Sequence, residues 1–494
     1  MTLMDAQGSV DRRSLAKDRR LRVGYVGVAF GSYYADEHDQ YGRAISGLRR
    51  LAGEMDFDLV AIGRGVEDLE AARDAASRLA SEQVDFLMLQ AAACASGELV
   101  EPLAGVAPRL GLWATPEPVL EGSIQLHSLV SINHYASIIR RYLRERGTPF
   151  KWFYGHIDEP DTDRRLRVTI RALQAIKTMA SARIGWIGGI SPGFYNMQFE
   201  EDNLAARFGT TIGHHTIGEV VDRARAIGEE EAVAVVRHAT DVATEVTAPS
   251  LGMDRNARIY LALGRMIEEE GYDALAVQCW PSFQDDFHVA PCMAYSLLGS
   301  EDGLAVSCEG DVPGAVTMLL MNAMSPAHGS STLLDLTTVD FEADAALLWH
   351  CGVSPRHFGG DNGIRWVDHV TLGRKSDVRY GVSGDLRFAP QKTTIAYAGD
   401  EFSEMFIATA DVVETGHAGF DGTRGWFSGF RLNGEPISLI DLVNTSVVQG
   451  HEHHFAVAQG DLSSELAEVA AWLGMRTTRA VPMRDYLQID GLNA

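Results

Sequence analysis

Short apolar runs alternate with amphipathic stretches of ten to fifteen residues along the chain to about residue 325. The runs have the length of buried strands and the stretches have the periodicity of helices. This alternation predicts parallel sheets covered by helices on both faces. A first unit is expected to have strands over 21–30, 57–65, 84–90 and 108–115 and helices over 43–55 and 69–83, and a second to have strands over 182–189, 273–280 and 304–306 and helices over 217–237 and 256–270.

The pattern changes after about residue 350, where short segments rich in Thr, Val and aromatic residues are separated by Gly and Asp turns. This pattern indicates an antiparallel sheet, and an amphipathic helix capped by Gly474 is expected after it over 463–474. The predicted fold class is therefore α/β, with two doubly wound α/β domains followed by a C-terminal, barrel-like antiparallel β domain. The predicted domains are 1–165, 166–345 and 346–494, and the β segments are 368–375, 393–399, 404–415 and 422–432.

Charge and composition limit the partners of this 494-residue chain. It carries 43 Lys and Arg against 67 Asp and Glu, a formal net charge of −24. Such a surface repels nucleic acid and anionic membranes. The first twenty residues are polar, and no apolar run approaches the roughly 18 residues that span a bilayer. The five cysteines are scattered without a CxxC pair, which disfavours a disulfide framework and a zinc ribbon. We expect a cytoplasmic protein.

Candidate chemistry is concentrated after the strand at 304–306. Two carboxylates, Glu309 and Asp311, flank Gly310, and Pro313 follows at the start of a helical pattern. The carboxyl ends of strands are where α/β sheets hold their ligands. Asp311 has the sequence context of a helix cap, whereas Glu309 fits a metal ligand and a surface carboxylate equally well. Asp335 follows a second apolar run.

Histidines and two strand-end side chains complete the candidate set. The segment 451–454 reads His-Glu-His-His, and His350 ends an apolar run, where it fits a ligand and a core histidine equally well. Carboxylates and imidazoles supplied by separate segments are able to hold a divalent cation. Gln278 and Trp280 end the strand at 273–280, and an amide with an indole suits a polyol substrate, although a packed Trp and a turn Gln explain them equally well.

In the order of these motifs the chain resembles the L-fucose/L-arabinose isomerase superfamily, metal-dependent aldose–ketose isomerases. The resemblance covers roughly residues 273–474, and Asp335 is similar to the fucose branch, since arabinose isomerases have Glu there. The matching segments are Cys308-Glu309-Gly310-Asp311, Leu334-Asp335-Leu336-Thr337, Leu348-Trp349-His350-Cys351-Gly352, His453-His454-Phe455 and the sugar-binding loop Gly193-Phe194-Tyr195.

The resemblance implies a site, a cofactor and an assembly. It implies Glu309 and Asp335 as catalytic residues and as metal ligands, His454 as a further ligand, and His350 as a ligand only in the arabinose branch. Mn²⁺ is the implied cofactor, with Mg²⁺ or Co²⁺ as alternatives, in a homo-oligomer that takes a small sugar as substrate. Gln278, Trp280 and Phe194 are the expected substrate-binding residues.

The predicted function is an Mn²⁺-dependent aldose–ketose isomerase of a pentose or 6-deoxyhexose, of the L-fucose/D-arabinose or L-arabinose type. Two alternatives remain from the residues alone. One is a sugar-binding protein without catalysis, since two consecutive α/β domains also build such proteins. The other is an epimerase or lyase acting on a sugar or sugar acid with the same metal site.

Overall fold

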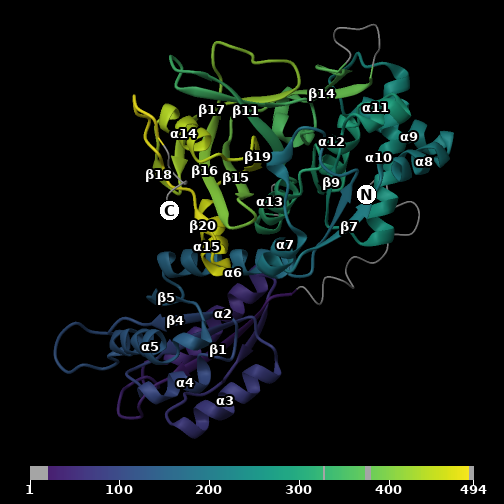
Figure 1. The fold of residues 1–494 in the computed structure, drawn as a ribbon. Coiled ribbons are helices and arrows are strands. Elements are labelled where there is room, and N and C mark those ends of the chain that lie inside the picture. The colour runs from purple at the N-terminus through teal and green to yellow at the C-terminus, as the bar shows by residue number, and fades with distance from the viewer. Residues whose placement is uncertain (1–19, 326–328, 373–379, 489–494) are drawn as a thin grey trace. The chain divides into compact units, whose positions relative to one another are not determined.

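A computed structural model of the chain describes residues 20–325, 329–372 and 380–488 (Figure 1). Contacts divide these residues into two compact units, one up to Lys177 and the other from Thr178 onward. Each unit is described separately. The predicted boundaries near 165 and 345 stay predictions, and the predicted absence of a secretory signal concerns residues that lie, apart from residue 20, outside the described ones.

The N-terminal unit contains one parallel five-stranded sheet. Its strand order is β2-β1-β3-β4-β5, and all four pairings are parallel. Strands β1, β3 and β4 are buried almost throughout, as apolar strands covered on both faces must be. The predicted doubly wound sheet is confirmed. The elements are β1 (Arg22–Val28), α2 (Gln40–Met55), β2 (Asp58–Ala61), α3 (Leu69–Ser81), β3 (Phe86–Ala91), α4 (Val100–Leu103), β4 (Leu110–Ala114), α5 (Ser128–Tyr142), β5 (Phe150–Tyr154) and α6 (Pro160–Met179).

A second parallel sheet, with order β10-β9-β6-β7, begins the other unit. The helical section predicted over 217–237 consists of two helices, α8 and α9, because Ile227 and Gly228 adopt extended backbone angles between them. The elements are β6 (Arg183–Ile187), α7 (Glu201–Phe208), β7 (Thr211–His215), α8 (Ile217–Ala226), α9 (Glu229–Asp241), α10 (Ser250–Glu270), β9 (Ala274–Val277), α11 (Ser282–Phe287), α12 (Cys292–Glu301), β10 (Ala305–Ser307) and α13 (Val312–Met324).

The predicted antiparallel domain is a closed ring of strands. Along the order β16-β15-β19-β11-β12-β17 every pairing is antiparallel, and β16 also pairs with β17. Closure leaves the ring without free edges. Its elements are β11 (Thr332–Asp340), β12 (Ala345–His350), β15 (Lys392–Gly399), β16 (Glu404–Val413), β17 (Thr423–Leu432), α14 (Leu439–Val448), β19 (His454–Gln459), α15 (Ser463–Leu473) and β20 (Arg476–Thr477), and β8 (Glu245–Val246), β13 (Arg365–Asp368) and β14 (Val382–Arg387) extend the same sheet.

The strand predicted over 368–375 is the exception in this domain. β13 ends at Asp368. His369 then accepts the backbone N–H groups of Thr371 and Leu372 through Nδ1, so the chain turns there instead of continuing as a strand. Residues 373–375 lie outside the described part of the chain.

Helix α13 joins the second α/β sheet to the ring. It contacts β9 and β10 on one side and β15 and β19 on the other (Figure 1). Almost all of its residues are buried, as expected for a helix that is apolar on every face. Asp311 is its N-cap and accepts the Gly314 backbone N–H at 2.8 Å, which confirms the predicted capping role. The loop before α13 is thereby held where the sheet and the ring meet.

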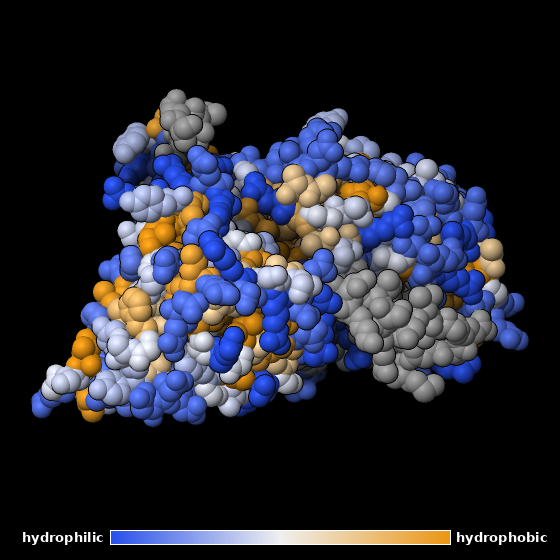
Figure 2. All heavy atoms as spheres, turned by 90° about the horizontal axis from the view of Figure 1, so that it is seen from below, coloured by the Kyte–Doolittle hydropathy of each residue, from blue (hydrophilic) through white to orange (hydrophobic). Residues whose placement is uncertain are grey.

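Hydrophilic side chains cover much of the visible surface (Figure 2). Figure 2 shows one face of the molecule, on which hydrophilic residues predominate and hydrophobic residues lie in scattered groups between them. Among the described residues, every helix is too short or too polar to cross a lipid bilayer.

Candidate metal centre and active site

Glu309 lies in a tight loop with a left-handed backbone (φ 62°), a conformation that is uncommon for a residue with a side chain. Three bonds hold this loop: Ser191 N–H donates to the Glu309 carbonyl at 2.9 Å, Gly310 N–H to the Val277 carbonyl at 3.1 Å, and Trp186 Nε1–H to the Gly310 carbonyl at 3.0 Å. Strained backbone that persists because its surroundings enforce it is typical of functional sites. The loop directs a carboxylate that is only 14 % exposed toward the ring.

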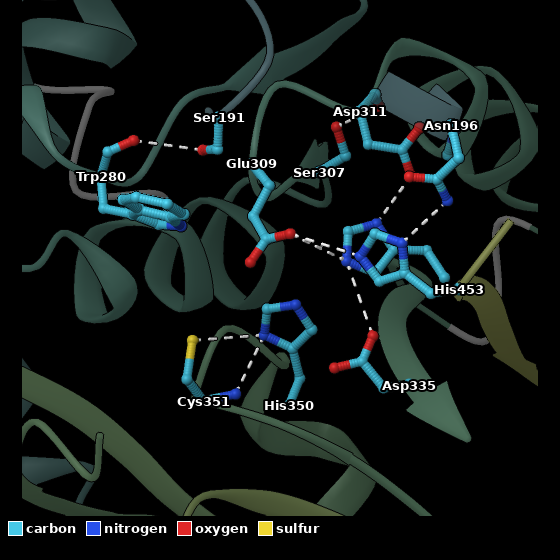
Figure 3. Close-up of polar contacts among 12 residues, drawn as sticks. Ser191, Asn196, Trp280, Ser307, Glu309, Asp311, Asp335, His350, Cys351 and His453 are labelled. Atoms are coloured by element: carbon cyan, nitrogen blue, oxygen red, sulfur yellow. Dashed lines mark hydrogen bonds and ion pairs between the residues drawn. The ribbon is translucent and has the colours of Figure 1, made fainter. Parts of the chain in front are cut away.

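Asp335 and His454 meet across two neighbouring strands of the ring. They are directly opposite each other in the antiparallel pairing of β11 with β19. Residues paired in this way carry their side chains on the same face. His454 Nε2 lies 3.6 Å from Asp335 Oδ1 and 3.5 Å from Glu309 Oε2, so the ring and the Glu309 loop contribute to one cluster (Figure 3).

Two further imidazoles reach the same place. His453 Nε2 lies 3.5 Å from Glu309 Oε2, and the centroids of the His453 and His454 rings are 4.1 Å apart. His350, the last residue of β12, lies with its ring centroid 5.5 Å from that of His454. Four groups of candidate ligand atoms, each within 4.8 Å, occur among the described residues. Two belong to this cluster, Glu309 with His453 and His454, and Asp335 with His350 and His454; the other two are cysteine groups, Cys308 with His350 and Cys351, and Cys292 with Cys351 and His369.

The polar atoms that face one another in this cluster have no hydrogen-bond partner. Such orphaned atoms are rare in folded proteins, because each costs about 1–3 kcal/mol of free energy when left unsatisfied. Two carboxylate oxygens and three imidazole nitrogens that converge suit a borderline divalent cation such as Mn²⁺ or Zn²⁺. The orphaned atoms are Glu309 Oε2, Asp335 Oδ1, His350 Nε2, His453 Nε2 and His454 Nε2.

Asp311 has a second function that its sequence context does not show. Its Oδ2 accepts the Nδ1–H of His454 at 3.0 Å, while its Oδ1 accepts the Gly314 N–H and, at 2.7 Å, the Tyr397 hydroxyl. Both Asp311 and His454 are almost fully buried. A carboxylate on one imidazole nitrogen keeps the proton there and leaves the other nitrogen free to bind a metal. Asp311 therefore orients His454 Nε2 toward Glu309 and Asp335.

Two of the three predicted substrate-binding residues, Phe194 and Trp280, form an aromatic group that contacts the cluster. Phe194 packs against the His453 ring with a centroid distance of 4.9 Å and against Trp280 at 6.1 Å. All three side chains are partly exposed, whereas His454 is buried. Gln278 differs, because its amide donates to the Gly188 and Ile190 carbonyls and accepts from Ser282. Its predicted contact with substrate stays a prediction and requires an exchange of these bonds.

Nearby negative charges raise the pKa of both His453 and His350. Burial favours neutral rings, but contact with Glu309 and the charges of Asp335 and Asp311 outweigh it and raise the pKa of His453. For His350, burial is outweighed by the Cys351 sulfur, 3.3 Å from Nδ1, and by the two acidic side chains, which together raise its pKa to about 10. The cluster attracts positive charge, as a cation site should.

Sequence reasoning did not include His453 or Asn196. Side chains alternate between the two faces of a strand, but β19 begins only at His454, so the preceding residue is free to point the same way. Asn196 contacts His453 Nδ1 at 3.1 Å from the loop that also carries Phe194. The adjacent histidines were a visible signal, whereas nothing local marked Asn196.

Glu452, beside this cluster, provides a stability test. Burial, with the charges of Asp311 and Asp400, raises its pKa from 4.5 to about 7. Between these values the folded protein holds a proton that the unfolded chain has lost, so stability falls as pH rises through the interval. We expect Glu452→Gln, which cannot ionise, to match the wild type near pH 4.5 and to exceed its unfolding free energy at pH 8 by at most about 3 kcal/mol.

Denaturant unfolding of both proteins across this pH range measures the difference. Glu435→Gln, which changes an exposed glutamate, is the control and should follow the wild-type curve. A Glu452→Gln protein whose stability has the same pH dependence as the wild type would show that burial does not keep Glu452 protonated.

The chain is distantly homologous to sugar isomerases, so the predicted class of enzyme is supported. The relatives are sulfoquinovose isomerases: those of Priestia megaterium and Priestia aryabhattai are each 24 % identical over 418 residues, covering 83 % of this chain and 88 % of theirs. The sulfoquinovose isomerase of Alkalicoccus urumqiensis is 25 % identical over 392 residues, covering 79 % of this chain and 84 % of its own. None of these three bears the name of a fucose or arabinose isomerase, so that finer family assignment stays a prediction.

Other comparisons add little. No family model matches the chain. An ABC transporter solute-binding protein from Burkholderia multivorans is 12 % identical and covers 61 % of this chain and 93 % of its own, with a TM-score of 0.16. A TM-score this low gives the likeness no weight for fold or function.

Proposed function

We propose that the protein is a divalent-metal-dependent aldose–ketose isomerase, with Mn²⁺ as cofactor and a pentose or 6-deoxyhexose as substrate. The convergence of five orphaned, buried polar atoms from the Glu309 loop, β11, the end of β12 and the segment that leads into β19 carries this proposal. The homology to sulfoquinovose isomerases supports the reaction class. Sulfoquinovose is itself a 6-deoxyhexose with a sulfonate on C6, so it belongs among the candidate substrates.

Interconversion of an aldose and a ketose moves a proton between C2 and C1 of the open-chain sugar through an enediol. Glu309 and Asp335 are carboxylates from different segments, each within 3.6 Å of His454 Nε2, so both are positioned to reach the same sugar carbons. One removes the C2 proton and returns it to C1, and the other moves the hydroxyl proton from O2 to O1, so that each proton removed is returned to the sugar. A bound divalent ion supplies a Lewis acid that polarises the carbonyl and stabilises negative charge on the sugar oxygens.

The protein's own residues divide the remaining tasks. Asp311 keeps His454 in the form that binds metal, and burial of His454 and Asp311 excludes water from that side. Phe194 and Trp280 offer apolar faces on which the C–H surface of a sugar can stack. No redox cofactor is required, because the reaction has no net transfer of electrons.

A substrate screen tests the proposal. Metal-stripped protein should convert none of the candidate aldoses, and added Mn²⁺ should restore formation of the ketose, measured with L-fucose, D-arabinose, L-arabinose and sulfoquinovose. Solvent deuterium should appear on the sugar carbon that receives the proton. Full activity after metal removal, or sugar binding by calorimetry without any ketose, would contradict the proposal.

A further inference from the structure

The two buried histidines of the cluster present opposite hydrogen-bonding states. His350 Nδ1 accepts the backbone N–H of Cys351 at 2.9 Å. An amide N–H only donates, so in the neutral ring this Nδ1 carries a lone pair and the ring proton is on Nε2. The Cys351 sulfur lies 3.3 Å from the same Nδ1, and a ring that gains a second proton keeps its Nε2–H as well. His454 Nδ1 instead faces the Asp311 carboxylate at 3.0 Å. A carboxylate accepts, so this Nδ1 carries the proton and Nε2 has the lone pair.

Both Nε2 atoms point into the same space. One nitrogen of each ring and an Asp335 oxygen lie within 4.8 Å of one another. His350 Nε2, His454 Nε2 and Asp335 Oδ1 are all buried without a hydrogen-bond partner. A lone pair on His454 is able to bind a cation held by Glu309 and Asp335. An N–H on His350 is not, because its hydrogen stands between the nitrogen and the ion. What it can bind is an oxygen.

We propose that His350 is a hydrogen-bond donor to an oxygen of the sugar and not a metal ligand, so that Glu309, Asp335 and His454 hold the cation without it. This inference rests on the proposed isomerase function and specifies the part that each histidine has in it. The sugar oxygens at C1 and C2 gain negative charge as the enediol forms, and a fixed donor in a buried site stabilises that charge most. His350 should therefore affect kcat more than KM.

The surroundings of His350 keep the ring proton on Nε2. Its side chain is 2 % exposed and ends β12, and the amide that its Nδ1 accepts belongs to the next residue in the chain. To bind a metal through Nε2, the ring would have to move the proton to Nδ1, opposite that N–H, and lose the bond. Further protonation of the ring also leaves Nε2 as a donor.

Three variants separate a donor from a ligand. Mn²⁺ is titrated into metal-stripped wild type, His350→Leu, His350→Gln and His454→Gln, and free Mn²⁺ is followed by its electron paramagnetic resonance signal. We expect both His350 variants to bind Mn²⁺ within about threefold of the wild type, and His454→Gln to bind it at least about 100-fold more weakly. Near-ultraviolet circular dichroism confirms that each variant is folded.

Turnover provides the second measurement. His350→Leu should lower kcat by about 10²–10³-fold, the usual effect of removing one such donor, with little change in KM. His350→Gln should recover part of this loss, because its side-chain NH₂ is able to donate from nearly the same position.

The outcomes distinguish the inference from the function on which it rests. Loss of Mn²⁺ affinity in His350→Leu comparable to that in His454→Gln makes His350 a ligand and overturns the inference, as does an unchanged kcat. A wild type that binds Mn²⁺ but converts no sugar overturns the proposed function, while the Mn²⁺ affinities still decide which histidine is the ligand. A wild type that binds no Mn²⁺ overturns both.

Discussion

Replacing Glu309 by Gln is expected to lower kcat by at least about 10³-fold while the protein remains folded. The substitution keeps the shape of the side chain and the left-handed backbone of the loop, which is held through main-chain bonds that a side-chain change does not touch. It removes the negative charge and the basic oxygen 3.5 Å from His454 Nε2. Loss of an acid/base group alone is worth about 10²–10⁴-fold, and weaker metal binding adds to it.

Steady-state kinetics at saturating Mn²⁺ and thermal unfolding measure the two effects of Glu309→Gln. Asp335→Asn should behave in the same way, because its Oδ1 faces the same nitrogen at 3.6 Å. Glu342→Gln, which changes an exposed carboxylate of the ring domain, is the control and should keep full activity. Full turnover in either site variant would show that the cluster is not the active site.

Asp311→Asn is expected to weaken Mn²⁺ binding by about 10–100-fold with little loss of stability. Asn is as good a helix cap as Asp, so its Oδ1 can still accept the Gly314 N–H and the Tyr397 hydroxyl. Its NH₂ group then faces His454 Nδ1. Because that group only donates, His454 must carry its proton on Nε2, where it blocks the cation.

Mn²⁺ titration of the metal-stripped Asp311→Asn protein measures the affinity, and thermal unfolding measures the effect on the fold. Tyr397→Phe is the matched control: it removes a bond to Asp311 Oδ1 but leaves the bond from His454 to Oδ2. We expect it to keep most of the affinity. Equal losses of affinity in the two variants would indicate that Asp311 acts through general packing and not through the protonation of His454.

Local sequence was sufficient for much of the fold. The apolar runs of the N-terminal unit match β1, β3 and β4, because buried parallel strands need continuous apolar surface. The strand, the Glu309 turn and the start of α13 were predictable from the residues between Ala305 and Pro313. Asp311 and Pro313 occupy positions whose chemistry is set by the helix terminus itself.

The pairing of strands that are far apart in the chain could not be predicted from local sequence. The apolar residues that precede Asp335 fit a strand of an α/β sheet and a strand of the ring equally well. Pairing with β12 and β19 makes this segment a strand of the ring. The register that places Asp335 opposite His454 depends on segments more than a hundred residues apart in the chain. Only the resemblance to known isomerases had linked these positions beforehand.

Composition and local pattern thus account for an acidic α/β protein with a β-rich C-terminal part, a Glu309 turn and an Asp311 cap, since each follows from neighbours along the chain. The folded chain adds the convergence of Glu309, Asp335 and His454, the contribution of His453, and the bond from His454 to Asp311. Its hydrogen bonds also place the ring proton on Nε2 in His350 and on Nδ1 in His454. These features arise from atoms that come into contact only when the sheet, α13 and the ring pack together. Hydrogen bonds between residues far apart in the chain cannot be predicted from the local sequence.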